Sequence, residues 1–152
     1  MRRWSSRFVA AALGTVALHA GLLAAASPSS NHAAGYQIIR NPHNPVEIVD
    51  RQFLEDAFLK KKTSWPTGSP IRPVDLPPTA PARREFSDHM LRRPVEAIRS
   101  FWQQRIFAGR DLPPPELKSD EEVIKFVMRE PGAIGYVSND AVLNGTKPLT
   151  VK

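Results

Sequence analysis

The sequence predicts an α/β fold in which one small mixed sheet is flanked by helices. Short β-prone runs alternate with longer segments whose apolar residues recur at helical spacing, and prolines cluster between them. The clearest signal lies over 129–137, where a helical pattern meets Pro131 and Gly132 and an apolar run follows. A residue before proline leaves the helical region, so we expect the helix to end there and Gly132 to adopt the positive φ of a tight reversal. We interpret the stretch as an ordinary connection to a buried strand, in which Gly135 lets a neighbouring backbone or a ligand approach closely.

Two strands and one helix are expected in the first half of the domain. Residues 36–39 form a β-prone run that ends at a turn rich in proline and asparagine. Asp50 is a suitable N-cap for a helix whose apolar residues recur at helical spacing over 53–58. The second strand is expected over 71–76, and Pro73 places it at a sheet edge or beside a bulge because proline cannot donate a ladder hydrogen bond.

Three further helices are expected before the C-terminal strands. The first begins near Pro81. The second begins after Pro94 and carries an apolar stripe between Val95 and Ile106, so we expect it to be the most buried helix. The third begins at the capping box formed by Ser119 and Glu122, and a short strand is expected just before the C-terminus.

Residues 1–26 have the three-part pattern of a secretory signal peptide. A basic start without acids is followed by an apolar stretch over 8–23 and by three alanines before the expected cleavage point. An uncleaved membrane anchor is the weaker alternative, because the apolar stretch is rich in alanine and glycine. We therefore expect a periplasmic or secreted protein without stable membrane insertion, with a disordered lead over 27–35 and a single domain over 36–152.

Composition limits the classes of function. Cleavage would leave 152 − 26 = 126 residues, enough for one small domain with one core. Loss of three signal arginines would leave 21 − 3 = 18 basic and 15 acidic residues, a net charge of +3. This mild excess fits a small anionic ligand and is too small for nucleic-acid binding. The absence of cysteine excludes disulfides, thiol nucleophiles and thiolate metal sites.

No motif supports catalysis, so we do not expect an enzyme. Ser87, Asp88 and His89 are the residue types of a hydrolase triad, but successive helix positions point about 100° apart and cannot line up with one another. Glu85 and His89 have the spacing of two metal ligands on one helix face, yet no further ligands accompany them. We therefore expect neither a metal nor a cofactor.

The start of the helix near Pro81 is the candidate binding site. A helix N-terminus presents free N–H groups and the positive end of its dipole to an anion. Thr79 adds a hydroxyl donor, and Ala80 lies at the turn. Arg83 or Arg84 would add charge-assisted hydrogen bonds. Pro81, in contrast, removes one backbone donor. The alternative is an ordinary capped helix with solvated arginines.

Several segments taken in order are similar to one known family. They are Phe58-Leu59, Trp65 to Ile71, Arg84-Glu85-Phe86, Phe107-Ala108-Gly109-Arg110, and Pro131-Gly132-Ala133-Ile134-Gly135-Tyr136-Val137. This series resembles the phosphate-binding proteins of ABC transporters, in the type 2 periplasmic binding protein superfamily. The resemblance covers about 36–137, and its last segment is the most specific.

The resemblance implies an exported protein whose relatives bind phosphate or a similar oxyanion at helix N-termini, in a cleft between two lobes. This chain would supply one lobe. Thr79, Ala80 and Pro81 stand where the family has Ser-Gly-Thr, and Asp75 falls near a position where the family often has arginine. The departures remove a close backbone approach and a hydroxyl donor, and Asp75 would repel a phosphate, so weak binding is expected.

These observations lead to two functional hypotheses. The first is a monomeric, phosphate-transporter-like solute-binding domain that binds phosphate or another small oxyanion weakly through Thr79, Ala80, Arg83 and Arg84, with an ABC permease as its membrane partner. The alternative is a non-enzymatic partner-binding or structural envelope protein that has lost its ligand. This alternative is motivated by Asp75, Pro81 and the missing second lobe.

Overall fold

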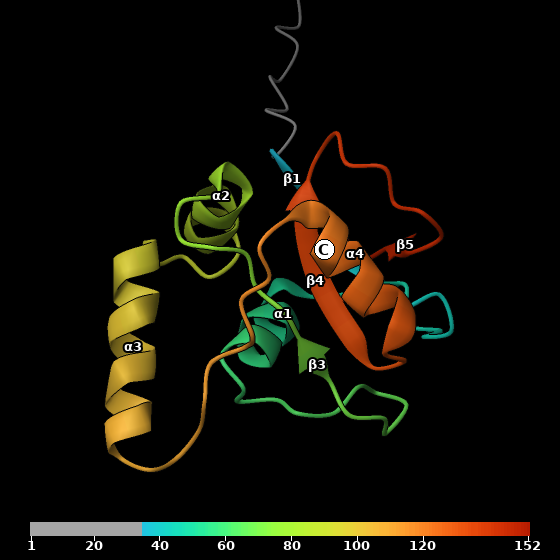
Figure 1. The fold of residues 1–152 in the computed structure, drawn as a ribbon. Coiled ribbons are helices and arrows are strands. Elements are labelled where there is room, and N and C mark those ends of the chain that lie inside the picture. Colours follow the sequence, from blue (N-terminus) through green and yellow to red (C-terminus); the bar gives the residue numbers. More distant parts are fainter. Residues whose placement is uncertain (1–34) are drawn as a thin grey trace, which may run out of the picture. The chain divides into compact units, whose positions relative to one another are not determined.

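A computed structural model describes residues 35–152 (Figure 1), so the expected signal peptide and nearly all of the expected lead lie outside the described residues. The main sheet has four strands in the order β3-β4-β1-β5. Strand β1 (Tyr36–Arg40) pairs antiparallel with β4 (Ala133–Ser138) and with β5 (Lys147–Pro148), whereas β3 (Arg72–Pro73) pairs parallel with β4. The sheet is therefore mixed, as the sequence predicts.

Two further strands and four helices complete the domain. Strands β2 (Ile48–Val49) and β6 (Thr150–Val151) form a separate parallel pair. The helices are α1 (Arg51–Phe58), α2 (Pro81–His89), α3 (Val95–Phe107) and α4 (Asp120–Arg129). None of the helices between residues 35 and 152 combines the length and the apolar character needed to cross a membrane.

Local sequence signals set the helix boundaries. Asp50 caps α1, because its Oδ1 accepts a hydrogen bond of 2.6 Å from the Phe53 amide. Ser119 caps α4 through a 3.3 Å bond from the Glu122 amide. The Glu122 carboxylate in turn accepts from the Lys118 amide, one residue earlier than the capping box predicts. Both predicted caps are therefore confirmed.

Helices α2 and α4 cover opposite faces of the two central strands. Successive residues of a strand point to opposite faces, so Gly135 and Tyr136 on β4 face different helices. A Cβ at Gly135 would lie 2.8 Å from a Val123 methyl group of α4, whereas the Tyr136 ring stacks on Phe86 of α2 with 3.9 Å between ring centroids. Figure 1 shows α4 lying in front of β4 and α3 set apart from the sheet.

The expectation that the helix after Pro94 is the most buried is wrong. Ile106 and Phe107 of α3 are 47% and 91% exposed. The cause is the position of α3, which packs mainly against α2 and lies away from the sheet (Figure 1). Its apolar stripe is therefore only partly covered.

Gly132 has a different role from the predicted one. Its φ is not positive, in contrast to those of Gly68, Gly109 and Gly145. A Cβ at Gly132 would lie 2.0 Å from the carbonyl oxygen of Pro70, so this position needs glycine for a close backbone approach. The space beside Gly135 is filled by valine side chains, which leaves no room there for a ligand.

The second predicted strand is shorter than expected. Of the range 71–76, only β3 pairs with the sheet, and it forms the sheet edge as Pro73 predicts. Beyond it, Asp75 makes an isolated parallel bridge with Glu116, in the segment that joins α3 to α4. Val74 still donates to the Ile134 oxygen of β4 at 3.0 Å, and the chain then leaves β4 and pairs with this connecting segment.

Candidate functional site

The N-terminus of α2 is open. Ala80 is the N-cap residue in an extended conformation, and no side chain of the described residues accepts a capping hydrogen bond there. Pro81 lies in the first turn and has no amide hydrogen. The first helical hydrogen bond is donated by the Arg84 amide to the Ala80 oxygen, at 3.3 Å. Within residues 35–152, the amides of Ala82 and Arg83 have no acceptor. Two backbone donors of this helix terminus therefore lack an acceptor within the described region, at residues that are 1% and 5% exposed.

Arg84 folds back over this helix terminus. Its Nη1 donates a 2.8 Å hydrogen bond to the backbone oxygen of Thr79, and both residues are exposed. The guanidinium thus lies beside the loop that leads into α2. A cation beside the positive end of a helix dipole is electrostatically unfavourable, and a bound anion would relieve this arrangement.

Arg83 points into the interior, where it forms a buried polar cluster with Asp75 and Tyr136. Arg83 makes an ion pair with Asp75, and the Tyr136 hydroxyl donates a hydrogen bond to the same carboxylate. The Arg83 Nη1 also lies 3.4 Å from the Tyr136 oxygen. The Leu76 amide donates to Asp75 Oδ1 at 3.0 Å and lies 3.3 Å from the Tyr136 oxygen. The cluster therefore satisfies the buried oxygens of Asp75 and Tyr136, whereas the Arg83 Nε has no partner among the described residues.

Burial and ion pairing shift the pKa values of Asp75 and Arg83 in opposite directions. Burial is the largest cause and raises the pKa of Asp75; together with the negative charge of Glu116 it outweighs the opposing effects of Arg83, Tyr136 and the Leu76 amide. Burial lowers the pKa of Arg83, but Asp75, Tyr136 and Glu116 together more than offset that effect, so the pKa of Arg83 is raised. The pKa of Tyr136 is raised by burial and by Asp75. Arg83 and Tyr136 therefore stay protonated at neutral pH.

The structure separates the two arginines that the sequence groups together. Arg84 lies at the surface beside Thr79 and Ala80, whereas Arg83 is only 5% exposed and its Nη1 is used by Asp75 and Tyr136. Sequence reasoning did not find the cluster. The signal was present, because an acid between Val74 and Leu76 in an apolar strand needs a buried partner.

The other candidate residues have structural surroundings. The Glu85 carboxylate accepts a 2.7 Å hydrogen bond from the Gly35 amide, and this bond holds the start of β1. Ser87 is buried, and its hydroxyl has no hydrogen-bond partner among residues 35–152. Across the described part of the chain, no three histidine or acidic side chains are grouped closely enough to hold a metal ion.

Comparison of the fold with solved structures identifies the class of protein that it resembles. An ABC-type phosphate transport receptor from Vibrio cholerae aligns with a TM-score of 0.61 and 20% identity over 77% of this chain and 46% of the receptor. PstS from Borrelia burgdorferi aligns with a TM-score of 0.58 and 15% identity over 78% and 47% of the two chains. The chain thus spans less than half the length of these proteins.

A third structure is similar to the chain. It is a phosphate ABC transporter substrate-binding protein from Clostridium perfringens with bound phosphate, with a TM-score of 0.52 and 20% identity over 77% of this chain and 44% of that one. No protein-family model and no curated protein matches the sequence at a significant level. The α/β class and the resemblance to phosphate-binding proteins are therefore confirmed through the fold.

Proposed function

We propose that this chain is a solute-binding domain that binds phosphate or a similar small oxyanion at the N-terminus of α2. The contacts are the free amides of Ala82 and Arg83, the Thr79 hydroxyl, the turn at Ala80, and the Arg84 guanidinium. Arg83 contributes its backbone amide and, from within the polar cluster, a positive charge balanced by Asp75. The similarity of the fold to phosphate receptors supports the choice of ligand.

The observation that carries this proposal is a difference among the helix N-termini. Asp50 caps α1, Ser119 caps α4 and is followed by three acids, and α3 has Glu96 in its first turn. Helix α2 has neither a side-chain cap nor an acid in its first turn. Of the four helices in the described region, α2 alone thus leaves its positive end without a carboxylate or hydroxyl from the protein.

The affinity is expected to be low. Thr79 and Arg84 are exposed, and hydrogen bonds made in water contribute little net free energy. We expect a dissociation constant on the order of 1 mM for phosphate, which corresponds to about 4 kcal/mol. Titration calorimetry with phosphate and with sulfate, at matched ionic strength in chloride, tests this expectation. The absence of heat and of thermal stabilisation at tens of millimolar anion would contradict the proposal.

Ala80→Asp is expected to stabilise the protein and to abolish oxyanion binding. Ala80 already has the extended conformation of an N-cap, with φ −68° and ψ 133°. An Asp side chain would accept from the free amides and add about 1 kcal/mol to the free energy of unfolding. Its negative charge would occupy the position of the anion. Urea unfolding and phosphate calorimetry on the same variant measure both effects.

Ala80→Asn is the matched control, because it offers a capping oxygen without a charge. It is expected to stabilise α2 to a similar degree and to weaken phosphate binding less than Ala80→Asp does. Equal phosphate affinity in the original protein and in Ala80→Asp would place the anion elsewhere.

The remaining parts of the proposal concern the cellular setting. We propose export to the periplasm or the cell exterior after cleavage near residue 26, a monomeric state, an ABC permease as the partner, and no enzymatic activity. The similar structures named as transport receptors support the transport setting. Mass spectrometry of the protein recovered from the envelope fraction would test cleavage directly.

A further inference from the structure

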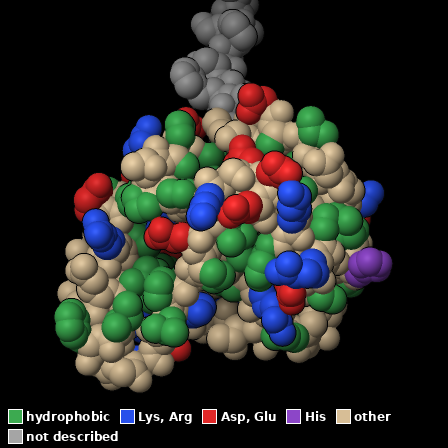
Figure 2. All heavy atoms as spheres, in the orientation of Figure 1, with side chains coloured by type: hydrophobic (Ala, Val, Ile, Leu, Met, Phe, Trp, Pro, Cys, Tyr) green, Lys and Arg blue, Asp and Glu red, His purple; other side chains and the backbone are tan. Residues whose placement is uncertain are grey.

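A pocket of about 260 Å³ lies between α3 and the connector that follows it. One wall is the apolar stripe of α3, with Ile98, Trp102 and Ile106, and the opposite wall includes Pro113 and Pro114. Figure 2 shows apolar side chains gathered over this part of the molecule. The pocket therefore lies beside the apolar stripe of a helix that packs away from the sheet.

The pocket walls are held in place before any ligand binds. The connector contains three consecutive prolines, which restrict its backbone. Two backbone hydrogen bonds to Asp75 hold the C-terminal end of this connector. The Asp75 amide donates to the Pro115 oxygen at 3.0 Å, and the Leu117 amide donates to the Asp75 backbone oxygen at 2.8 Å. Trp102 is only 6% exposed and offers a rigid aromatic surface. A preformed apolar pocket with a few polar groups is typical of a small-molecule site.

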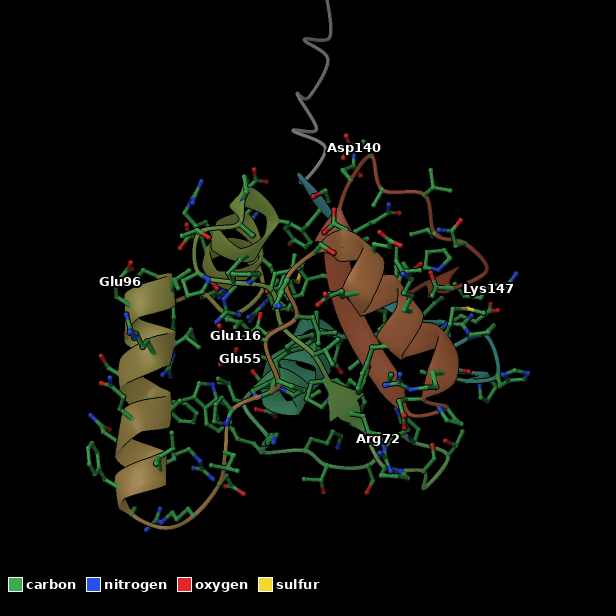
Figure 3. All side chains as sticks on the ribbon, in the orientation of Figure 1. Glu55, Arg72, Glu96, Glu116, Asp140 and Lys147 are labelled. Atoms are coloured by element: carbon green, nitrogen blue, oxygen red, sulfur yellow. The ribbon has the colours of Figure 1, made fainter. Side chains whose placement is uncertain are left out.

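Four charged side chains line the pocket, and only two are paired with each other. Asp75 and Arg83 form the buried ion pair described above. Arg99 of α3 and Glu116 of the connector are exposed, and neither has an ion-pair or side-chain hydrogen-bond partner within residues 35–152. Figure 3 shows that Glu116 of the connector lies in the space next to α3, whereas Glu96 lies at the N-terminal end of α3. Among residues 35–152, the pocket therefore has one cation and one anion without an ion-pair partner.

We infer that this pocket binds a small zwitterion with an apolar body, of the amino-acid class. Its apolar side chain would pack against Ile98 and Trp102, its ammonium group would pair with Glu116, and its carboxylate with Arg99. A simple carboxylate would leave Glu116 without a partner, and a simple amine would leave Arg99 without one. Arg83 lines this pocket and also belongs to the proposed anion site at α2, but the proposed contacts of the zwitterion, Arg99, Glu116 and the apolar face of α3, are not part of that site.

The test uses the full chain and a set of matched small molecules. L-phenylalanine and L-leucine are expected to bind with dissociation constants of roughly 0.1–1 mM and to shift the indole N–H signal of Trp102 in an NMR titration. Glycine lacks the apolar body, 3-phenylpropionate lacks the ammonium group and phenethylamine lacks the carboxylate, so each is expected to bind at least about fivefold more weakly. No binding of either amino acid at about 10 mM, or equal binding of 3-phenylpropionate, would overturn the inference.

Exposed charges provide variants that keep the fold. Arg99→Gln and Glu116→Gln are each expected to weaken L-phenylalanine binding about three- to tenfold. Arg93→Gln and Glu96→Gln remove one exposed charge of the same sign outside the pocket lining, and they are expected to leave binding unchanged. Equal losses in the pocket variants and in these controls would overturn the assignment of the two charges. Phosphate binding is measured in parallel, and its presence or absence does not bear on this result.

Discussion

Arg83→Met is expected to lower the free energy of unfolding by about 3–5 kcal/mol. The substitution would leave the Asp75 carboxylate, which is 5% exposed, without its cation in the interior. The hydrogen bonds from Tyr136 and the Leu76 amide would remain, and they satisfy the carboxylate oxygens without neutralising the charge. Urea unfolding followed by tryptophan fluorescence would give the change, provided that the dependence on urea concentration stays the same.

A double-mutant cycle separates the ion pair from simple loss of packing. Asp75→Leu alone is expected to be strongly destabilising, because it leaves the Arg83 guanidinium buried and unpaired. The double variant Asp75→Leu with Arg83→Met removes both charges and is expected to be more stable than either single variant. Arg84→Met is the control on the same helix, where the side chain is exposed and the expected change is within about 0.5 kcal/mol. Additive single effects would show that the two charges are not coupled.

The elements of this fold could be predicted because their signals are local. Asp50 and Ser119 cap the helices that the sequence assigns to them, and the proline after Glu130 ends α4 as expected, with φ −102° and ψ 112° at Glu130. The edge position of β3 follows from Pro73 in the same way. In each case the residues that determine the structure lie within a few positions of one another.

The candidate site could be predicted only in part, because side-chain partners come from distant segments. The open N-terminus of α2 follows from Ala80 and Pro81, which lie side by side in the sequence. The partner of Arg83 is on another element, and Tyr136 is 53 residues away from it. The pocket beside α3 depends on where that helix docks, and an apolar stripe does not specify which surface will cover it. The partner of Arg83 and the pocket beside α3 are therefore determined by tertiary packing.

The second large effect is expected at the Pro131-Gly132 turn, which joins α4 to β4. Gly132→Ala is expected to cost about 3 kcal/mol or more, because the new Cβ would lie 2.0 Å from the backbone oxygen of Pro70. The loop that carries Pro70 cannot move freely. The Gly132 oxygen accepts bonds from the Arg72 amide at 2.9 Å and from the indole of Trp65 at 3.0 Å. The substitution would therefore separate two segments that these bonds hold together.

Two other glycines serve as controls for this prediction. Gly135→Ala would bring a methyl group within 2.8–3.0 Å of valine side chains, which can shift, so a loss of about 1–3 kcal/mol is expected. Gly68→Ala has open space around it and a φ of +86°, so only backbone strain of about 1 kcal/mol is expected. Thermal and urea unfolding should rank the losses as Gly132, Gly135 and Gly68 in decreasing order. If Gly132→Ala were as mild as Gly68→Ala, the close approach to Pro70 would not be what requires glycine in this turn.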